Sequence, residues 1–405
     1  MEMYKNSKFS AEERAADLLS RLTLEEKVAQ LGSVIVNDLV DDNNNIVHEK
    51  LAAHLKYGCG HISRAAWMLG EIEIEDATDL INQIQEYLVT STRLGIPAIL
   101  HEECLNGVQA RHATVFPQSI GVASTWNEDT VFSIGDCLRK QLRAKGATQG
   151  LAPVLDVVRD PRWGRTEETY GEDPYLISKI GTAYVKGLQG NDLTEGVLAT
   201  AKHFLGYGAS EGGMNQAPVH INARELREIY GRPFEAVIKE ADLGSIMNSY
   251  SEIDGVPCTI SRELLTDILR DEFQFKGIVV SDYGAIDTVS TYHRAAVDMK
   301  DAGIKAIRAG MDMELPFTLC YGDNLIEAVK EGKVEEEVIN RSVMRVLLKK
   351  SNWGCLIKLV YSLSGSTRFT RQSKIKRLRE KRQESQSSFS KIKITSCRCI
   401  NRSNP

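Results

Sequence analysis

The sequence lacks the segments that would place a protein in or across a membrane. No apolar run approaches the roughly 18 residues that a membrane-spanning helix needs. Residues 1–8 contain neither an apolar core nor a small-residue cleavage site, so they do not resemble a secretory signal. These absences exclude a membrane-spanning protein and predict a cytoplasmic location.

Paired cysteine motifs are also missing. The eight cysteines are scattered along the chain, and none forms the C-x-x-C pattern of a zinc site. A chain of 405 residues can bury a core that needs neither disulfides nor a metal for its stability. We therefore expect reduced thiols and no metal site.

Signatures of several other enzyme classes are absent too. The sequence contains no Walker A loop, no dinucleotide-binding fingerprint and no G-x-S-x-G elbow. Residues 101–105 read H-E-E-C-L rather than H-E-x-x-H, which excludes a zincin site. No cofactor is therefore expected.

Positive charge is scarce in the body of the chain and concentrated at its end. Residues 351–405 contain 13 Lys and Arg against 2 Asp and Glu, whereas residues 1–350 contain 37 against 53. An acidic body argues against a nucleic-acid enzyme, because binding to phosphates needs a basic surface. The change in charge predicts a folded domain over residues 1–350 and a separate basic tail over residues 351–405.

Short apolar runs alternate with amphipathic stretches along the body of the chain. The predicted strands are residues 96–100, 151–158, 196–200, 243–247 and 277–280, with weaker ones at 58–62 and near Ile307. The predicted helices are residues 10–32, 127–145, 176–189, 222–241, 261–273 and 324–350. Runs without strict alternation are typical of parallel strands that are buried on both faces. This order predicts an α/β fold, a (β/α)8 TIM-like barrel, with a doubly wound sheet as the alternative.

Two of these helices carry local signals. Ser261 is positioned to cap the helix that starts after it, ahead of the apolar positions Leu264 and Leu265. Gly231 and Pro233 predict that the helix over residues 222–241 is kinked or split.

Polar residues follow most of the predicted strands. In a barrel the carboxyl ends of the strands converge on one face, which predicts one acid-rich pocket there. In a doubly wound sheet the same residues would be ordinary strand ends. They are Glu102, Glu103, Arg159, Asp160, Lys202, His203, Asn248, Tyr250, Asp282, Asp312 and Glu314.

Four long motifs identify a family. Residues 151–175 read L-A-P-V-L-D-V-V-R-D-P-R-W-G-R-T-E-E-T-Y-G-E-D-P-Y, and residues 201–208 read A-K-H-F-L-G-Y-G. Residues 246–257 read I-M-N-S-Y-S-E-I-D-G-V-P, and residues 277–285 read G-I-V-V-S-D-Y-G-A. All four occur in this order in family 3 glycoside hydrolases. Over about residues 10–350 the chain therefore resembles the N-terminal catalytic barrel of that family.

The resemblance implies a retaining β-glycosidase. In such enzymes a carboxylate attacks the anomeric carbon, and a second group protonates the leaving oxygen and later activates water. The family nucleophile is the Asp of the V-S-D motif, which is Asp282 in this sequence. The substrates implied are small oligosaccharides or aryl β-glycosides.

The same resemblance implies a sugar-binding shell. Arg159, Lys202 and His203 match the residues that bind ring hydroxyls, and Met247 and Tyr250 match positions next to the nucleophile. The alternative from the residues alone is that Arg159 pairs with Asp160 or Asp156 and that Lys202 forms an ion pair lining the barrel. In that case Met247 and Tyr250 fill the core. The remaining charged residues of the longest motif, which include Arg162, Arg165, Glu167, Glu168, Glu172 and Asp173, are expected to form structural Arg–carboxylate pairs.

One departure from the family pattern concerns the sugar. Many β-glucosidases of the family have Asp in a D-A-x-H-G stretch, where this chain has E-C-L-N-G starting at Glu103. The additional methylene pushes the carboxylate into space that a glucose hydroxymethyl group would fill, and a pentose lacks that group. With Tyr283 instead of Trp after the nucleophile, the chain resembles the β-xylosidase branch. A β-glucosidase and a β-N-acetylhexosaminidase are the alternatives.

A second departure concerns the acid/base residue. In most members this Glu lies on a second α/β sandwich domain, and this chain ends before such a domain. Hexosaminidase relatives use a D-x-H dyad in the loop after K-H-F, which here reads L-G-Y-G-A-S-E-G-G-M-N-Q. The resemblance thus implies that the second domain is absent and that the acid/base is not in the chain. A catalytically impaired carbohydrate-binding protein is the alternative.

The tail suggests how the second domain was lost. Family domains leave their last barrel helix through a stretch like K-F-K-L-G-L-F, whereas this chain continues K-S-N-W-G-C from Lys350. Back-translation with one added base permits F-K-L-G-L-F in the shifted frame. We infer a one-base deletion or sequencing error near codon 351. A genuine basic tail that binds anionic partners is the alternative.

Overall fold

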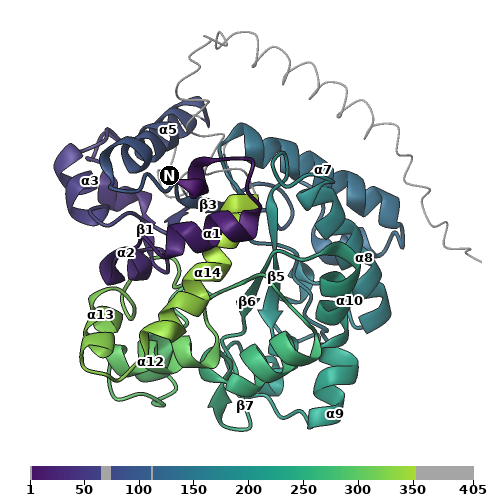
Figure 1. Cartoon of the computed structure of the whole chain (residues 1–405). Helices are drawn as coiled ribbons and strands as arrows, with labels where there is room; N and C mark the ends of the chain where they lie inside the picture. Colours follow the sequence, from purple (N-terminus) through teal and green to yellow (C-terminus); the bar gives the residue numbers. More distant parts are fainter. Residues whose placement is uncertain (1, 65–73, 111–112, 353–405) are drawn as a thin grey trace, which may run out of the picture. The chain divides into compact units, whose positions relative to one another are not determined.

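Figure 1 shows the computed structural model, which describes residues 2–64, 74–110 and 113–352. Seven strands form one parallel sheet, and each strand pairs with the next strand of this sheet along the sequence. They are β1 (Ser33–Ile35), β2 (His61–Ser63), β3 (Ile99–Glu102), β4 (Gln149–Gly150), β5 (Leu198–Phe204), β6 (Ser245–Asn248) and β9 (Ile278–Val280). This order contains no reversal, so the doubly wound alternative is wrong.

The sheet curls back toward its first strand. Met313 forms a parallel bridge with Val280 of β9. On the other side, the Glu314 N–H donates to the Leu31 carbonyl at 3.0 Å, and the Ser33 hydroxyl donates to the Glu314 carbonyl at 2.8 Å. The segment around Met313 therefore lies between β9 and β1, and the architecture is an α/β barrel-like domain.

The helices surround the strands (Figure 1). α7, α8 and α10 pack side by side along one flank, and α1 packs on α14. Between β6 and β9 the chain also forms a small hairpin of β7 (Glu252–Ile253) and β8 (Val256–Pro257). The α-helices are α1 (Ala11–Leu19), α2 (Leu24–Ala29), α3 (His48–His54), α5 (Ile74–Ser91), α6 (Ser119–Ala123), α7 (Glu128–Ala144), α8 (Pro174–Gln189), α9 (Ala223–Glu225), α10 (Arg232–Ala241), α11 (Thr288–Thr291), α12 (Met299–Ala309), α13 (Asp323–Lys330) and α14 (Glu336–Asn352).

Both local helix signals are confirmed. The Ser261 hydroxyl accepts a hydrogen bond from the Leu264 N–H at 3.3 Å, at the start of a π-type helix over Glu263–Glu272. The stretch over residues 222–241 is split at Gly231, where a π-type segment gives way to α10. Pro233 lies in the first turn of α10, where its missing N–H costs nothing.

Two predicted helices are wrong because each is a pair. Residues 10–32 form α1 and α2, and the second begins with its own capping box between Thr23 and Glu26. Residues 324–350 form α13 and α14, which are separated by Gly332 with a φ of +70°.

Two predicted strands are misplaced, and one strand was not predicted. The strand expected at residues 151–158 is β4 at Gln149–Gly150 instead, because Pro153 in the apolar run cannot donate to a ladder. The region near Ile307 belongs to α12, which Asp298 caps by accepting from the Asp301 N–H at 2.7 Å. β1 was not predicted and has only three residues.

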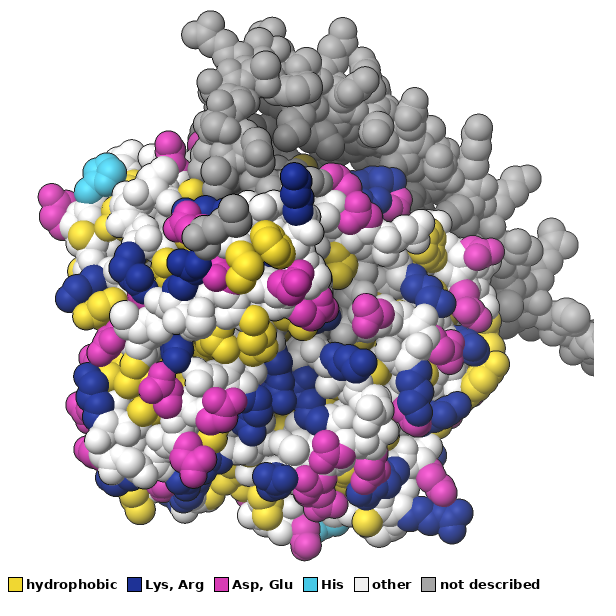
Figure 2. All heavy atoms as spheres, viewed as in Figure 1, with side chains coloured by type: hydrophobic (Ala, Val, Ile, Leu, Met, Phe, Trp, Pro, Cys, Tyr) yellow, Lys and Arg dark blue, Asp and Glu magenta, His cyan; other side chains and the backbone are white. Residues whose placement is uncertain are grey.

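The surface and the cysteines show ordinary features. On the face drawn in Figure 2, acidic and basic side chains are interspersed. The cysteines within the described residues are unpaired, at positions 59, 104, 137, 258 and 320. None of the helices in this part of the chain is long and apolar enough to cross a membrane. The basic tail and its proposed frame shift fall on residues 353–405, which lie outside the described residues.

Asp312 and Glu314 were expected in the pocket, but their contacts are structural. The Glu314 carboxylate accepts the backbone N–H groups of Cys320 and Tyr321, both at 2.8 Å. Asp312 is fully buried and pairs with Arg270 and Arg345, each at 2.8 Å. These bonds tie the segment between β9 and β1 to the surrounding loop and helices.

Replacement of Asp312 by Ala should lower the free energy of unfolding by about 3–5 kcal/mol, because two arginines lose a buried partner. Urea denaturation followed by circular dichroism measures this change. The control is Asp271→Ala, which removes an exposed carboxylate from the end of the Glu263–Glu272 helix. Equal effects of the two variants would contradict a structural role for the Asp312 pairs.

Candidate active site

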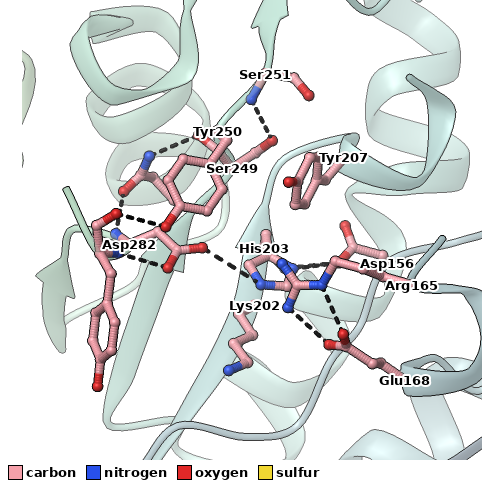
Figure 3. Close-up of polar contacts among 12 residues, drawn as sticks. Asp156, Arg165, Glu168, Lys202, His203, Tyr207, Ser249, Tyr250, Ser251 and Asp282 are labelled. Atoms are coloured by element: carbon pink, nitrogen blue, oxygen red, sulfur yellow. Dashed lines mark hydrogen bonds and ion pairs between the residues drawn. The ribbon is translucent and has the colours of Figure 1, made fainter. Parts of the chain in front are cut away.

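The carboxyl ends of β5, β6 and β9 bring polar side chains together (Figure 3). Lys202 and His203 belong to β5, and Asp282 lies two residues after β9. The Asp282 N–H donates to Asn248 Oδ1 on β6 at 2.9 Å, and its own Oδ1 accepts from the Tyr283 N–H at 2.7 Å. The second carboxylate oxygen of Asp282 has no hydrogen-bond partner among the described residues. Asp282 is thus held by its backbone and one oxygen, and Oδ2 is left for a ligand.

His203 lies between two carboxylates. Its Nδ1 is 2.8 Å from Asp156 Oδ2, and its Nε2 is 3.6 Å from Asp282 Oδ2. Burial lowers the pKa of His203 well below its usual value, so the ring is neutral at neutral pH. Asp156 Oδ2 also accepts the His203 backbone N–H at 3.1 Å, which assigns the imidazole proton to Nδ1. The unprotonated Nε2 therefore faces Asp282 and can accept a hydrogen bond.

Asp156 is a site residue that the sequence interpretation named only as an alternative partner for Arg159. Burial raises the pKa of the Asp156 carboxyl to about 7. Its Oδ1 has no hydrogen-bond partner among the described residues. A carboxylate at this point fixes the orientation of the His203 ring, as acidic partners of functional histidines commonly do.

Opposing effects act on the Asp282 carboxyl. Burial raises its pKa, and the cations Lys202 and Arg165 together with the Tyr250 hydroxyl act in the opposite direction. Lys202 is itself buried and pairs with Glu103 at 2.9 Å. Burial outweighs the other effects, so the pKa of Asp282 is raised, and the two cations favour the ionised form that can attack carbon.

Arg165 is the second residue that the sequence interpretation underestimated. It forms the expected structural pair, with two hydrogen bonds to Glu168 at 2.8 and 2.7 Å. Its guanidinium Cζ also lies over the Tyr207 ring, 5.6 Å from the ring centre. The charge of Arg165 interacts favourably with that of Asp282. Tyr207 in turn packs edge-on against His203, with ring centres 5.1 Å apart. Arg165 therefore belongs to the site as well as to its frame.

The structure brings most of the other predicted residues to the same place. Tyr250 donates its hydroxyl to the Tyr283 carbonyl at 2.7 Å, and the Tyr283 hydroxyl lies 2.7 Å from His101 Nε2. Met247 is almost fully buried and packs in the hydrophobic core, next to Asn248 at the end of β6. Tyr250 is thus more than core filling, because its hydroxyl reaches the segment of the nucleophile.

Arg159 is not brought into this cluster. Its side chain is 47% exposed and lies 3.7 Å from Glu225. Asp160, one of its expected partners, pairs with Arg162 instead, at 2.6 Å. The hydroxyl-binding role of Arg159 therefore stays a prediction. No group of three or more His, Cys, Asp or Glu side chains that could hold a metal is found in the described part of the chain.

The sequence matches one family profile. Residues 23–348 match the glycosyl hydrolase family 3 N terminal domain. A β-xylosidase from Formosa agariphila is 34% identical over 307 residues, which are 72% of this chain and 42% of that protein. A periplasmic β-glucosidase from Salmonella typhimurium is 35% identical over 340 residues, 84% of this chain and 42% of that protein. The chain thus spans less than half of the length of these curated relatives.

Solved structures of β-glucosidases are also similar to this chain. A β-glucosidase from Erythrobacter marinus has a TM-score of 0.82 and 35% identity, over 90% of this chain and 49% of that one. A mutant β-glucosidase from Listeria innocua, solved in complex with laminaribiose, has a TM-score of 0.78 and 31% identity. That match covers 89% of this chain and 50% of the other.

Proposed function

Because the chain belongs to glycosyl hydrolase family 3, we propose that it is a retaining β-glycosidase that removes terminal β-linked xylose or glucose through a covalent intermediate on Asp282. Its relatives are named β-xylosidases and β-glucosidases, which supports glycoside hydrolysis. The observation that carries the proposal is the state of Asp282. It is buried, has one unbonded oxygen, and interacts with the cations Lys202 and Arg165, which favour its ionised form.

The proposed reaction has two steps. In the first, Asp282 Oδ2 bonds to the anomeric carbon while the bond to the leaving oxygen breaks, and that oxygen takes the bonding electrons and leaves as a phenolate or, when it is a sugar alkoxide, takes a proton from solvent. In the second, the oxygen of a water molecule bonds to the anomeric carbon, the bond to Oδ2 breaks to restore the carboxylate, and the proton goes to solvent. Oδ1 stays bonded to the Tyr283 N–H at 2.7 Å, so only one oxygen is available for attack. His203 Nε2, 3.6 Å from Oδ2, accepts a sugar hydroxyl next to the reacting carbon.

Covalent trapping tests the proposal. A dinitrophenyl 2-fluoro-β-xyloside should label the 405-residue chain once, and mass spectrometry of a digest should find the label on the peptide that contains Asp282. The matched control is Asp254→Asn, which changes an exposed carboxylate in the β7–β8 turn and should still be labelled. Labelling of another carboxylate, or none, would overturn the nucleophile assignment. Sugar binding without labelling would support the carbohydrate-binding alternative.

The preference between xylose and glucose is predicted to depend on the length of the side chain at position 103. Glu103→Asp withdraws the carboxylate by about one methylene, so preference should shift from xyloside toward glucoside by roughly 10- to 200-fold. The measurement is the ratio of kcat/KM for the two aryl glycosides. Glu103→Gln is the control, since it keeps the length but removes the charge that pairs with Lys202 at 2.9 Å. It should lower both activities and leave the ratio unchanged. An unchanged ratio in Glu103→Asp would remove this residue from the specificity argument.

A further inference from the structure

His293 lies in the segment that follows the nucleophile, just beyond α11, and its side chain is only 3% exposed. Its Nε2 is 3.0 Å from the Tyr250 carbonyl, and its Nδ1 is 3.3 Å from the Glu252 carboxylate. Tyr250 and Glu252 belong to the segment between β6 and the end of β7. One imidazole therefore joins the segment after β9 to the segment after β6.

Both partners of this ring are hydrogen-bond acceptors. A backbone carbonyl can only accept, and an ionised carboxylate can only accept as well. The His293 ring contacts one of these acceptors through each of its nitrogens, Glu252 on β7 and the Tyr250 carbonyl. Its face is flanked by the Tyr292 ring of its own segment, whose centre is 5.0 Å away. Both ring nitrogens are therefore occupied by the segment after β6.

Tyr250 is held at both of its ends. Its carbonyl accepts from His293, while its hydroxyl donates to the Tyr283 carbonyl at 2.7 Å. Tyr283 directly follows the nucleophile, and its N–H donates to Asp282 Oδ1 at 2.7 Å. A shift of the Tyr250 backbone would therefore disturb the residue that holds the nucleophile carboxylate, whose pKa the Tyr250 hydroxyl also acts to lower.

We propose that His293, bound to Glu252 and to the Tyr250 carbonyl, is a positioning residue that holds the Tyr250 hydroxyl on the backbone next to Asp282. This inference rests on the proposed role of Asp282. The residue acts through Tyr250 and does not itself contact the sugar. Loss of the tether should slow formation of the glycosyl-enzyme, because misplacement of a site group by about 1 Å can cost ~10²-fold in rate.

A double-mutant cycle separates positioning from a general structural role. In the 405-residue chain, His293→Phe removes both bonds, and the dinitrophenolate burst on dinitrophenyl β-xyloside should slow by roughly 10- to 100-fold. In a Tyr250→Phe background, which lacks the hydroxyl, the same substitution should slow it by less than threefold. His54→Phe changes an exposed histidine on α3 and should leave the burst unchanged. Equal effects of His293→Phe in both backgrounds would overturn the inference.

The other partner of the ring provides a second test that does not depend on how well His293→Phe folds. Glu252→Ala removes the carboxylate that lies 3.3 Å from His293 Nδ1, so the burst should slow in the wild-type background and change by less than threefold in the Tyr250→Phe background. Equal effects of Glu252→Ala in both backgrounds would overturn the role of the His293–Glu252 pair. Trapping at Asp282 is read separately, so failure of the nucleophile assignment and failure of this inference are distinguishable.

Discussion

Replacement of Asp282 by Asn should lower turnover of an aryl β-xyloside by about 10⁴- to 10⁶-fold, because an amide cannot form the ester intermediate. The fold should persist. Asn keeps an oxygen for the Tyr283 N–H, and the Asn248 contact uses the backbone of residue 282. Steady-state rates and a urea unfolding curve measure the two expectations.

The control for this substitution is again Asp254→Asn. It makes the same chemical change in the exposed turn between β7 and β8, where Asn tolerates the positive φ of 52°. Its rate should match the wild type. An Asp282→Asn variant that retains near wild-type activity would mean that another group is the nucleophile.

The second large effect concerns the leaving group. The sequence motifs predict that the acid/base lies outside this chain. Dinitrophenolate leaves without protonation, so dinitrophenyl β-xyloside should release a burst of phenol. Xylobiose has an alkoxide leaving group and should react at least ~10²- to 10⁴-fold more slowly, the usual contribution of general acid catalysis.

The lifetime of the glycosyl-enzyme provides a second check on the prediction that the acid/base is missing. Without a base to activate water, the glycosyl ester should persist, and added azide should speed its turnover. Restoring the reading frame near codon 351 together with the downstream domain should recover xylobiose hydrolysis. Efficient xylobiose hydrolysis by the 405-residue chain would contradict this account. Glu211, in the loop after β5, would then be the first residue to replace.

The sequence was most informative where long motifs coincide with strand ends. Asp282, Lys202 and His203 were predicted from such motifs, and the structure places them within one cluster. Arg159 and Arg165 could not be ranked in the same way. Both lie in a segment that includes a short 3-10 turn over Thr166–Glu168, which has no regular period to say which side chain faces inward. Only the folded chain shows that Arg165 turns toward Tyr207 and Asp282.

Secondary structure was predictable where apolar runs were long. Helices α7 and α8 fall within one or two residues of the predicted ranges, because each carries a continuous apolar face. β1 and β4 have three and two residues, which is too short for a pattern to rise above the surrounding chain. The division between α1 and α2 had a readable signal, since Thr23 and Glu26 have the spacing of a capping box.

The contact between the two ends of the curled sheet has a consequence for synthesis on the ribosome. Each strand of the seven-stranded sheet after β1 pairs with the strand of that sheet made before it, but the bonds of Glu314 to Leu31 and of Lys350 to Gln30 span about 280 to 320 residues. Until the segment around Met313 emerges, the nascent sheet has open edges at β1 and β9, and such edges invite pairing with other chains. The nascent domain is therefore most prone to aggregation late in translation, when six or seven strands are present and the first still lacks its closing neighbour.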